Sequence, residues 1–139
     1  MIADFQRRCD AIEESYEFML AYAAQGLTGK EGSASGGQLR EHLTRADEAL
    51  SGLAELLRAI IDSDALEPAQ TYHAFHGVLE RDARDARAAV QLVLAQPAIS
   101  SQVVDNLNAS IHLRALLTDL FLIDEILKGR ATGGPATVP

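Results

Sequence analysis

Apolar side chains recur at alternating steps of three and four residues along most of this chain, the period of an α-helix with one buried face. The clearest case is an unbroken heptad series between residues 39 and 60. Its members are Leu39, Leu43, Ala46, Leu50, Leu53, Leu57 and Ile60. Such spacing lets side chains interlock with those of a neighbouring helix at a shallow crossing angle. The pattern therefore predicts packed helices rather than strands.

Glycine and proline residues divide the helical pattern into four segments. We predict helices over residues 2–25, 38–62, 68–95 and 100–128. Gly26 and Gly129 follow the first and last segments, where helices commonly end, and Pro68 and Pro97 mark the other breaks. Residues 130–139 have no apolar period, so we expect a disordered tail.

Four helices of similar length joined by short connections predict one all-α domain over residues 1–129. The simplest arrangement is a four-helix bundle in up-down-up-down, antiparallel order. A chain of 139 residues is long enough to bury a core of its own without disulfides.

The charge balance and the single cysteine narrow the class of protein. Twelve Lys and Arg residues against twenty Asp and Glu residues give a net charge of −8, the wrong sign for binding a phosphate backbone. We therefore expect no nucleic-acid partner. Cys9, the one cysteine, excludes an intramolecular disulfide and fits a reducing compartment. The polar N-terminus and the lack of a long uncharged stretch predict a cytoplasmic protein without a membrane segment.

The last predicted helix carries more apolar surface than one core needs. One line of side chains is assigned to the core, and it contains Leu113, Leu116, Leu117, Leu120, Phe121 and Leu127. A second line lies roughly opposite and contains Val104, Ile111, Ala115, Leu122 and Ile126. In the first predicted helix, Phe18 and Tyr22 similarly point away from the core stripe. Since these two helices are neighbours in the predicted bundle, we expect their outer faces to form one exposed apolar patch.

An exposed apolar patch on a protein without a complete catalytic set favours an interaction role. We expect a non-enzymatic helical adaptor that needs no cofactor. It self-associates as a homodimer, the commonest way to cover such a surface, and binds a protein partner through its apolar helix faces. The predicted interface consists of Phe18, Tyr22, Val104, Ile111, Leu122 and Ile126.

A metal- or small-ligand-binding bundle is the alternative. His73, His76 and Glu80 share one flank of the third predicted helix, and His112 and Asp119 on the last helix could face them. This set would match hemerythrins and ferritins in architecture only. The chain has no Glu-x-x-His motif of the ferritin-like di-iron bundles, and its four histidines are too few for a hemerythrin ligand set. We therefore expect no bound metal.

Catalytic chemistry is the third possibility. Cys9 lies on a core stripe with no basic activator, which predicts an inert thiol. Asp124 and Glu13 lie at the margins of apolar faces, where a buried carboxylate needs a partner or a raised pKa. The alternative for Asp124 is that its side chain reaches water one turn from the helix end. No nucleophile elbow or phosphate-binding loop occurs, so we expect no enzyme.

Overall fold

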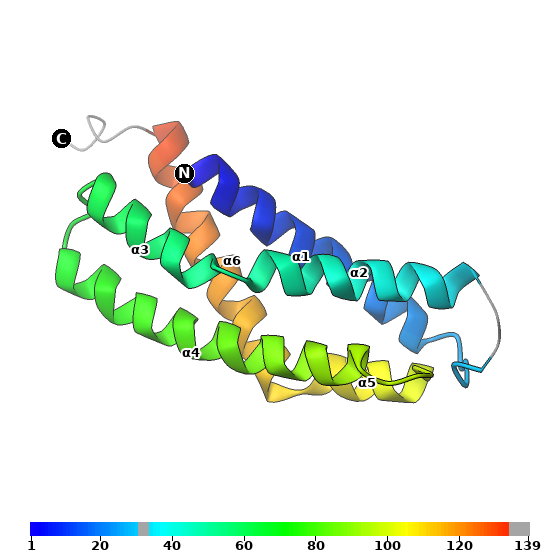
Figure 1. Ribbon diagram of the computed structural model, residues 1–139. Coiled ribbons are helices and arrows are strands. Elements are labelled where there is room, and N and C mark those ends of the chain that lie inside the picture. Colours follow the sequence, from blue (N-terminus) through cyan, green and yellow to red (C-terminus); the bar gives the residue numbers. More distant parts are fainter. Residues whose placement is uncertain (31–33, 134–139) are drawn as a thin grey trace.

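The computed structural model describes residues 1–30 and 34–133, with side chains as far as Arg130 (Figure 1). Over these residues every regular element is a helix, which confirms the predicted all-α class. The helices are α1 Ile2–Ala23, α2 Ala34–Leu50, α3 Leu53–Ser63, α4 Ala69–Leu94, α5 Ser101–Ala109 and α6 Ile111–Gly133. Within the described ranges, no helix combines the length and the apolarity needed to cross a membrane.

The second predicted helix, residues 38–62, is in fact two helices. Gly52 adopts a left-handed conformation with φ of +77° and separates α2 from α3. The heptad series continues across this break, and Leu50 and Leu53 on either side of it are both buried. A heptad series specifies which face of a helix is buried. Because glycine adopts a left-handed conformation without steric cost, Gly52 can bend the helix axis while the same face stays buried. The prediction was right about the buried face and wrong about the continuity of the helix.

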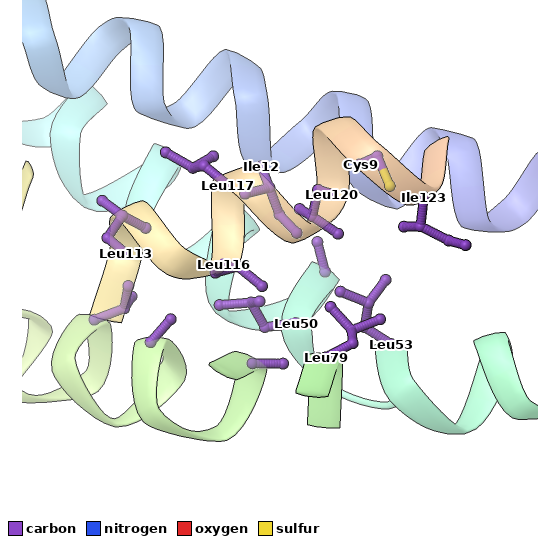
Figure 2. Packing of buried hydrophobic residues seen from close by; sticks show 14 of the residues in the cluster. Cys9, Ile12, Leu50, Leu53, Leu79, Leu113, Leu116, Leu117, Leu120 and Ile123 are labelled. Carbon is purple, nitrogen blue, oxygen red and sulfur yellow. The ribbon is translucent and has the colours of Figure 1, made fainter. Parts of the chain in front are cut away.

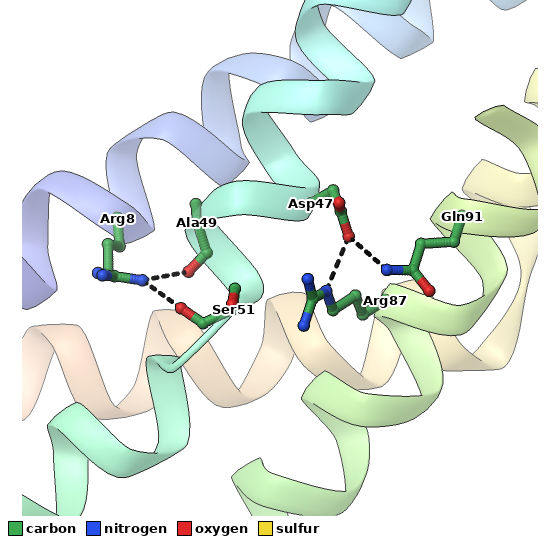
Figure 3. Close-up of polar contacts among 6 residues, drawn as sticks. All are labelled: Arg8, Asp47, Ala49, Ser51, Arg87 and Gln91. Carbon is green, nitrogen blue, oxygen red and sulfur yellow. Dashed lines mark hydrogen bonds and ion pairs between the residues drawn. The ribbon is translucent and has the colours of Figure 1, made fainter.

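The break between α2 and α3 is held from both sides by arginines (Figure 3). Arg8 Nη1 of α1 donates hydrogen bonds to the carbonyl oxygens of Ala49, at 3.3 Å, and of Ser51. These carbonyls end α2 and have no partner within the helix, and a cation there also suits the helix dipole. On the α4 side, Arg87 Nε donates to Asp47 Oδ1 at 2.8 Å. The bend is therefore fixed by side chains from two other helices.

The last predicted helix, residues 100–128, is likewise divided, at Ser110. This residue has extended backbone angles, φ −63° and ψ 143°, and follows α5. Its hydroxyl accepts a hydrogen bond from the Leu113 amide at 3.3 Å and so caps α6. Ser100 caps α5 in the same way, accepting from the Val103 amide at 3.1 Å. Ser110 was not identified from the sequence as a second start signal.

Two other boundaries differ from prediction by four residues or more. α2 begins at Ala34, four residues before the predicted start, and α6 continues through Gly129 to Gly133. Glycine lowers helix propensity but does not by itself end a helix, and Arg130 suits a last turn. The first four residues of the predicted disordered tail are therefore helical. Residues 134–139 lie outside the described part of the chain.

The core lies around α6 (Figure 2). This helix packs on α4 and also contacts α1, while α1 packs mainly on α2 and α5. Six apolar residues of α6 are buried, namely Leu113, Leu116, Leu117, Leu120, Ile123 and Leu127. The predicted core line is right except for Phe121, which is exposed, whereas Ile123 takes the core position.

We predict that Arg8→Ala lowers the free energy of unfolding by about 1–3 kcal/mol, because hydrogen bonds from a charged donor to the end of α2 are lost. Urea denaturation measures this change. The matched control is Arg7→Ala, since Arg7 is the exposed neighbour and forms an ion pair with Asp4 at 3.6 Å. The control should change stability by no more than about 0.5 kcal/mol. Equal effects of the two substitutions would contradict the role given to Arg8.

Candidate functional site: an apolar groove between α4 and α6

Two of the predicted interface residues lie inside the protein. Tyr22 and Val104 are both buried, so their expected place on an outer surface is wrong. The Tyr22 hydroxyl donates a hydrogen bond to the Ile99 carbonyl oxygen at 2.7 Å, because the chain before α5 folds over the end of α1. The break at Ser110 gives α5 a rotation of its own and turns Val104 towards the core.

Phe18 faces α2 rather than the last helix. Its ring is half-buried and stacks on His42 with 4.4 Å between the ring centroids. Phe18 therefore belongs to the contact between α1 and α2. The expected shared patch over the first and last helices does not form.

The other three predicted interface residues lie on the outside of α6. Ile111, Leu122 and Ile126 are 75%, 53% and 40% exposed. At 100° per residue they occupy one side of the helix, next to its buried face. Leu122 and Ile126 border the start of α4, because they line one hollow together with Tyr72 and Phe75. The second apolar line is thus open along α6, but its neighbour is α4 and not α1.

A hollow of about 340 Å³ lies where this line meets the start of α4. From α6 it is lined by Leu122, Ile123 and Ile126, and from α4 and the turn before it by Glu67, Pro68, Thr71, Tyr72 and Phe75. Tyr72 and Phe75 continue the apolar period of α4, and both are half-buried and line the hollow. Each pattern was visible in the sequence. The rotation of α4 and α6 relative to each other was not visible in the sequence.

A pair of carboxyl groups lies beside this hollow. Asp119 of α6 is only 8% exposed, and no N–H or hydroxyl group of the described residues donates to its Oδ2. Burial raises the pKa of Asp119 to about 7, and a hydrogen bond with Asp82 of α4 and repulsion from its charge add to the rise. Asp119 also lines a second hollow, of about 520 Å³, which reaches back along α6 to Ile111. Asp119 thus belongs to the second hollow and lies one helical turn before Leu122 of the first. Because Asp119 meets Asp82 of α4, we call the two hollows together with this pair the α4–α6 groove.

The predicted metal ligands are not brought together. His73 Nε2 lies 3.1 Å from Asp62 Oδ1 of α3, so its flank of α4 faces α3, whereas Asp82 meets Asp119 on the flank that faces α6. His112 is exposed on α6. Across residues 1–30 and 34–130, no group of three or more His, Cys, Asp and Glu side chains could hold a metal ion. The structure therefore does not bring the residues of the alternative metal-binding set together at one site. These residues are His73, His76, Glu80, His112 and Asp119.

Asp124 is buried rather than open to water, and Lys128 is its partner. Lys128 Nζ lies 3.1 Å from Asp124 Oδ2. Burial raises the pKa of the Cys9 thiol well above its usual range, and the charges of Asp124 and Glu13 raise it further. Burial also raises the pKa of Glu13. A thiol held in this protonated state is a poor nucleophile.

Comparisons of this chain with protein-family models, with curated proteins and with solved structures found no match in any of the three. Inference about function therefore starts from the groove and its two carboxyl groups.

We predict that Asp119→Asn removes a pH dependence of stability. Because the pKa of Asp119 is raised from 3.8 to about 7, the folded protein keeps a proton that the unfolded chain releases. The contribution of this proton to stability is complete below about pH 4 and is lost as the pH rises through about 7. Relative to the wild type, the variant should therefore gain stability from pH 4 to 7 and be the more stable protein at about pH 8. Urea denaturation at several pH values measures the difference.

The control for this experiment is Glu125→Gln, which removes one negative charge from an exposed position on the same helix. The difference in free energy of unfolding between this variant and the wild type should show no steady trend over that pH range. If the stability difference between Asp119→Asn and the wild type is equally independent of pH, the pKa of Asp119 is not raised.

We also predict that Cys9 in the folded protein reacts with iodoacetamide at least ~100-fold more slowly than in urea, because the thiol is buried and protonated. Mass spectrometry of samples quenched over time measures both rates. A folded protein alkylated as fast as the unfolded chain would contradict the burial of Cys9.

Proposed function

We propose that this all-α protein is a non-enzymatic adaptor that binds an α-helix of a partner protein in the α4–α6 groove. The supporting observation is the hollow in which exposed Leu122 and Ile126 meet half-buried Tyr72 and Phe75. Soluble proteins rarely leave contiguous apolar surface open without a binding role. A groove between two helices suits the apolar face of a third, amphipathic helix.

The dimensions of the groove fit such a partner. Leu122 and Ile126 are one helical turn apart, which matches apolar side chains of a partner at positions i and i+4. From Ile111 to Ile126 the exposed line extends roughly 22 Å, at 1.5 Å per residue. A partner helix of about 15 residues would cover it. Tyr72 and Phe75 would supply most of the contact area, as aromatic residues do at the centres of interfaces.

The scaffold keeps the groove open in the absence of a partner. Both of its helices have a second face in the core, with Leu79 of α4 and Leu116 of α6 fully buried. In this proposal the chain is an antiparallel bundle of four rods, in which α2–α3 and α5–α6 are the two interrupted rods. Little rearrangement would be needed on binding, so most of the binding free energy would be retained.

Charge favours a different protein over a second copy as the occupant. A two-fold contact centred on the carboxyl pair would bring Asp82 and Asp119 of one copy near the same residues of the other. Like charges brought together at an interface oppose association, and the whole chain already carries −8. Self-association, which the sequence predicts, is therefore an outcome to be tested.

The test uses phage-displayed amphipathic helical peptides of about 15 residues, randomised on one face and selected on the wild-type protein. We predict that Leu122→Glu weakens binding of the selected peptides at least 10-fold, because a charge would enter the apolar hollow. Fluorescence polarisation with labelled peptides measures the affinity. The matched control is Leu92→Glu, because Leu92 is 66% exposed on α4 and does not line the groove. The control should bind within about 2-fold of the wild type.

Peptides that bind both variants equally, or no selected peptides, would contradict the proposal. Light scattering of the free protein tests whether a second copy of this chain occupies the groove. A dimer that Leu122→Glu converts to a monomer, while Leu92→Glu does not, would make a second copy the occupant and overturn the choice of a partner protein.

A further inference from the structure

We infer that the partner helix carries an arginine or lysine between two apolar residues, and that Asp82 and Asp119 bind this cation midway along the α4–α6 groove. The inference rests on the proposed function and specifies the chemistry of the partner.

The position of the carboxyl pair leads to this conclusion. Asp119 lines the hollow that includes Ile111 and Ala115, and Leu122, one turn further on, lines the other hollow. A helix that fills both hollows must therefore pass over Asp119 and its neighbour Asp82. Whatever covers the groove covers the pair as well.

Covering the pair with apolar groups alone would be unfavourable. Asp119 is already more than nine-tenths buried, and its hydrogen-bond neighbour is a second carboxyl group, Asp82, while no N–H or hydroxyl group of the described residues donates to its Oδ2. Asp82 is still partly exposed, so an apolar cover would remove the water that solvates it. A carboxyl group that loses water without gaining a donor opposes binding strongly. The occupant must therefore bring a hydrogen-bond donor to this point.

A cationic donor fits better than a neutral one. In the described part of the chain, no Lys, Arg or His forms an ion pair with Asp82 or Asp119. A guanidinium group has five donors in one plane and can serve two carboxylates, and an ammonium group has three. Such a cation would also reduce the repulsion between the two carboxyl groups.

The remaining charges along the groove agree with a basic partner. Glu67 lines the first hollow, and its Oε2 accepts a hydrogen bond from the Ala69 amide at 2.9 Å. Arg114 lines the second hollow and is the one basic residue among the lining residues of the two hollows. Three carboxyl groups against one guanidinium leave the groove acidic. This charge, added to the −8 of the whole chain, attracts a basic helix over a longer range.

The experiment repeats the peptide selection on the wild type and on the double variant Asp82→Asn, Asp119→Asn. Wild-type selections should be enriched in Arg or Lys at one position flanked by apolar residues about one turn away on each side. That enrichment should disappear on the double variant, because neutral amides do not favour a cation. The control double variant Asp85→Asn, Glu125→Gln removes two exposed charges from the same two helices and should retain the enrichment.

Affinities then measure the coupling directly. Replacing the selected basic residue by glutamine should weaken binding to the wild type by about 10-fold or more, and to the double variant by less than about 2-fold. Circular dichroism before each titration checks that both variants are folded.

The possible failures are distinguishable. Peptides whose binding depends on Leu122 but which show no basic preference would overturn this inference and leave the proposed function in place. An equal loss on changing the basic residue to glutamine in both proteins would also overturn it. If no selected peptide depends on Leu122, the proposed function and this inference both fail.

Discussion

The rotation of α6 about its own axis determines the rest of the structure. Its buried leucines, among them Leu116 and Leu120, pack among side chains of the other helices (Figure 2). Leu127 is completely buried as well. Burial of each such side chain contributes roughly 1.5–3 kcal/mol, so a different rotation would lose several of these contributions at once. With that face fixed, Leu122 and Ile126 must lie outside the core on the side next to α4. The groove is therefore a consequence of core packing in a helix that has more apolar residues than the core can hold.

The breaks in the helices serve the same packing. At Ser51 and Gly52 the chain changes direction, and Arg8 supplies the donors that the end of α2 needs (Figure 3). At Ser110 the change of direction lets α5 pack along α1 while α6 packs on α4. There the Asn108 side chain donates a hydrogen bond to the Met19 carbonyl oxygen at 3.1 Å. Each interruption thus allows two short helices to bury faces that one straight helix could not bury together.

Helical class and most buried faces could be predicted from apolar spacing, because that spacing reports one helix at a time. The heptad series from Leu39 to Ile60 is buried as expected. The bend within it was not predicted. Val104 shows the limit of this reasoning. Its position opposite the core line holds only if the helix continues through Ser110, and the chain interrupts it there. Asp124 could have been paired with Lys128 from their four-residue spacing alone.

The carboxyl pair could not be predicted in this way. Asp82 and Asp119 are 37 residues apart in the sequence, and neither has a spacing that distinguishes it from other acidic residues of its helix. Their contact depends on how α4 and α6 are rotated and shifted against each other. Tyr72 and Phe75 were likewise visible as an apolar stripe, but their share in an open groove depends on the same two variables.

Methyl NMR of the free protein with a soluble paramagnetic probe tests the open groove most directly. The account predicts that the methyl signals of Leu122 and Ile126 broaden strongly, that those of Leu116 and Leu120 remain sharp, and that Leu122 gives an Overhauser effect to the Phe75 ring. Sharp Leu122 and Ile126 signals in the presence of the probe would show that the groove is already covered, and would contradict the account.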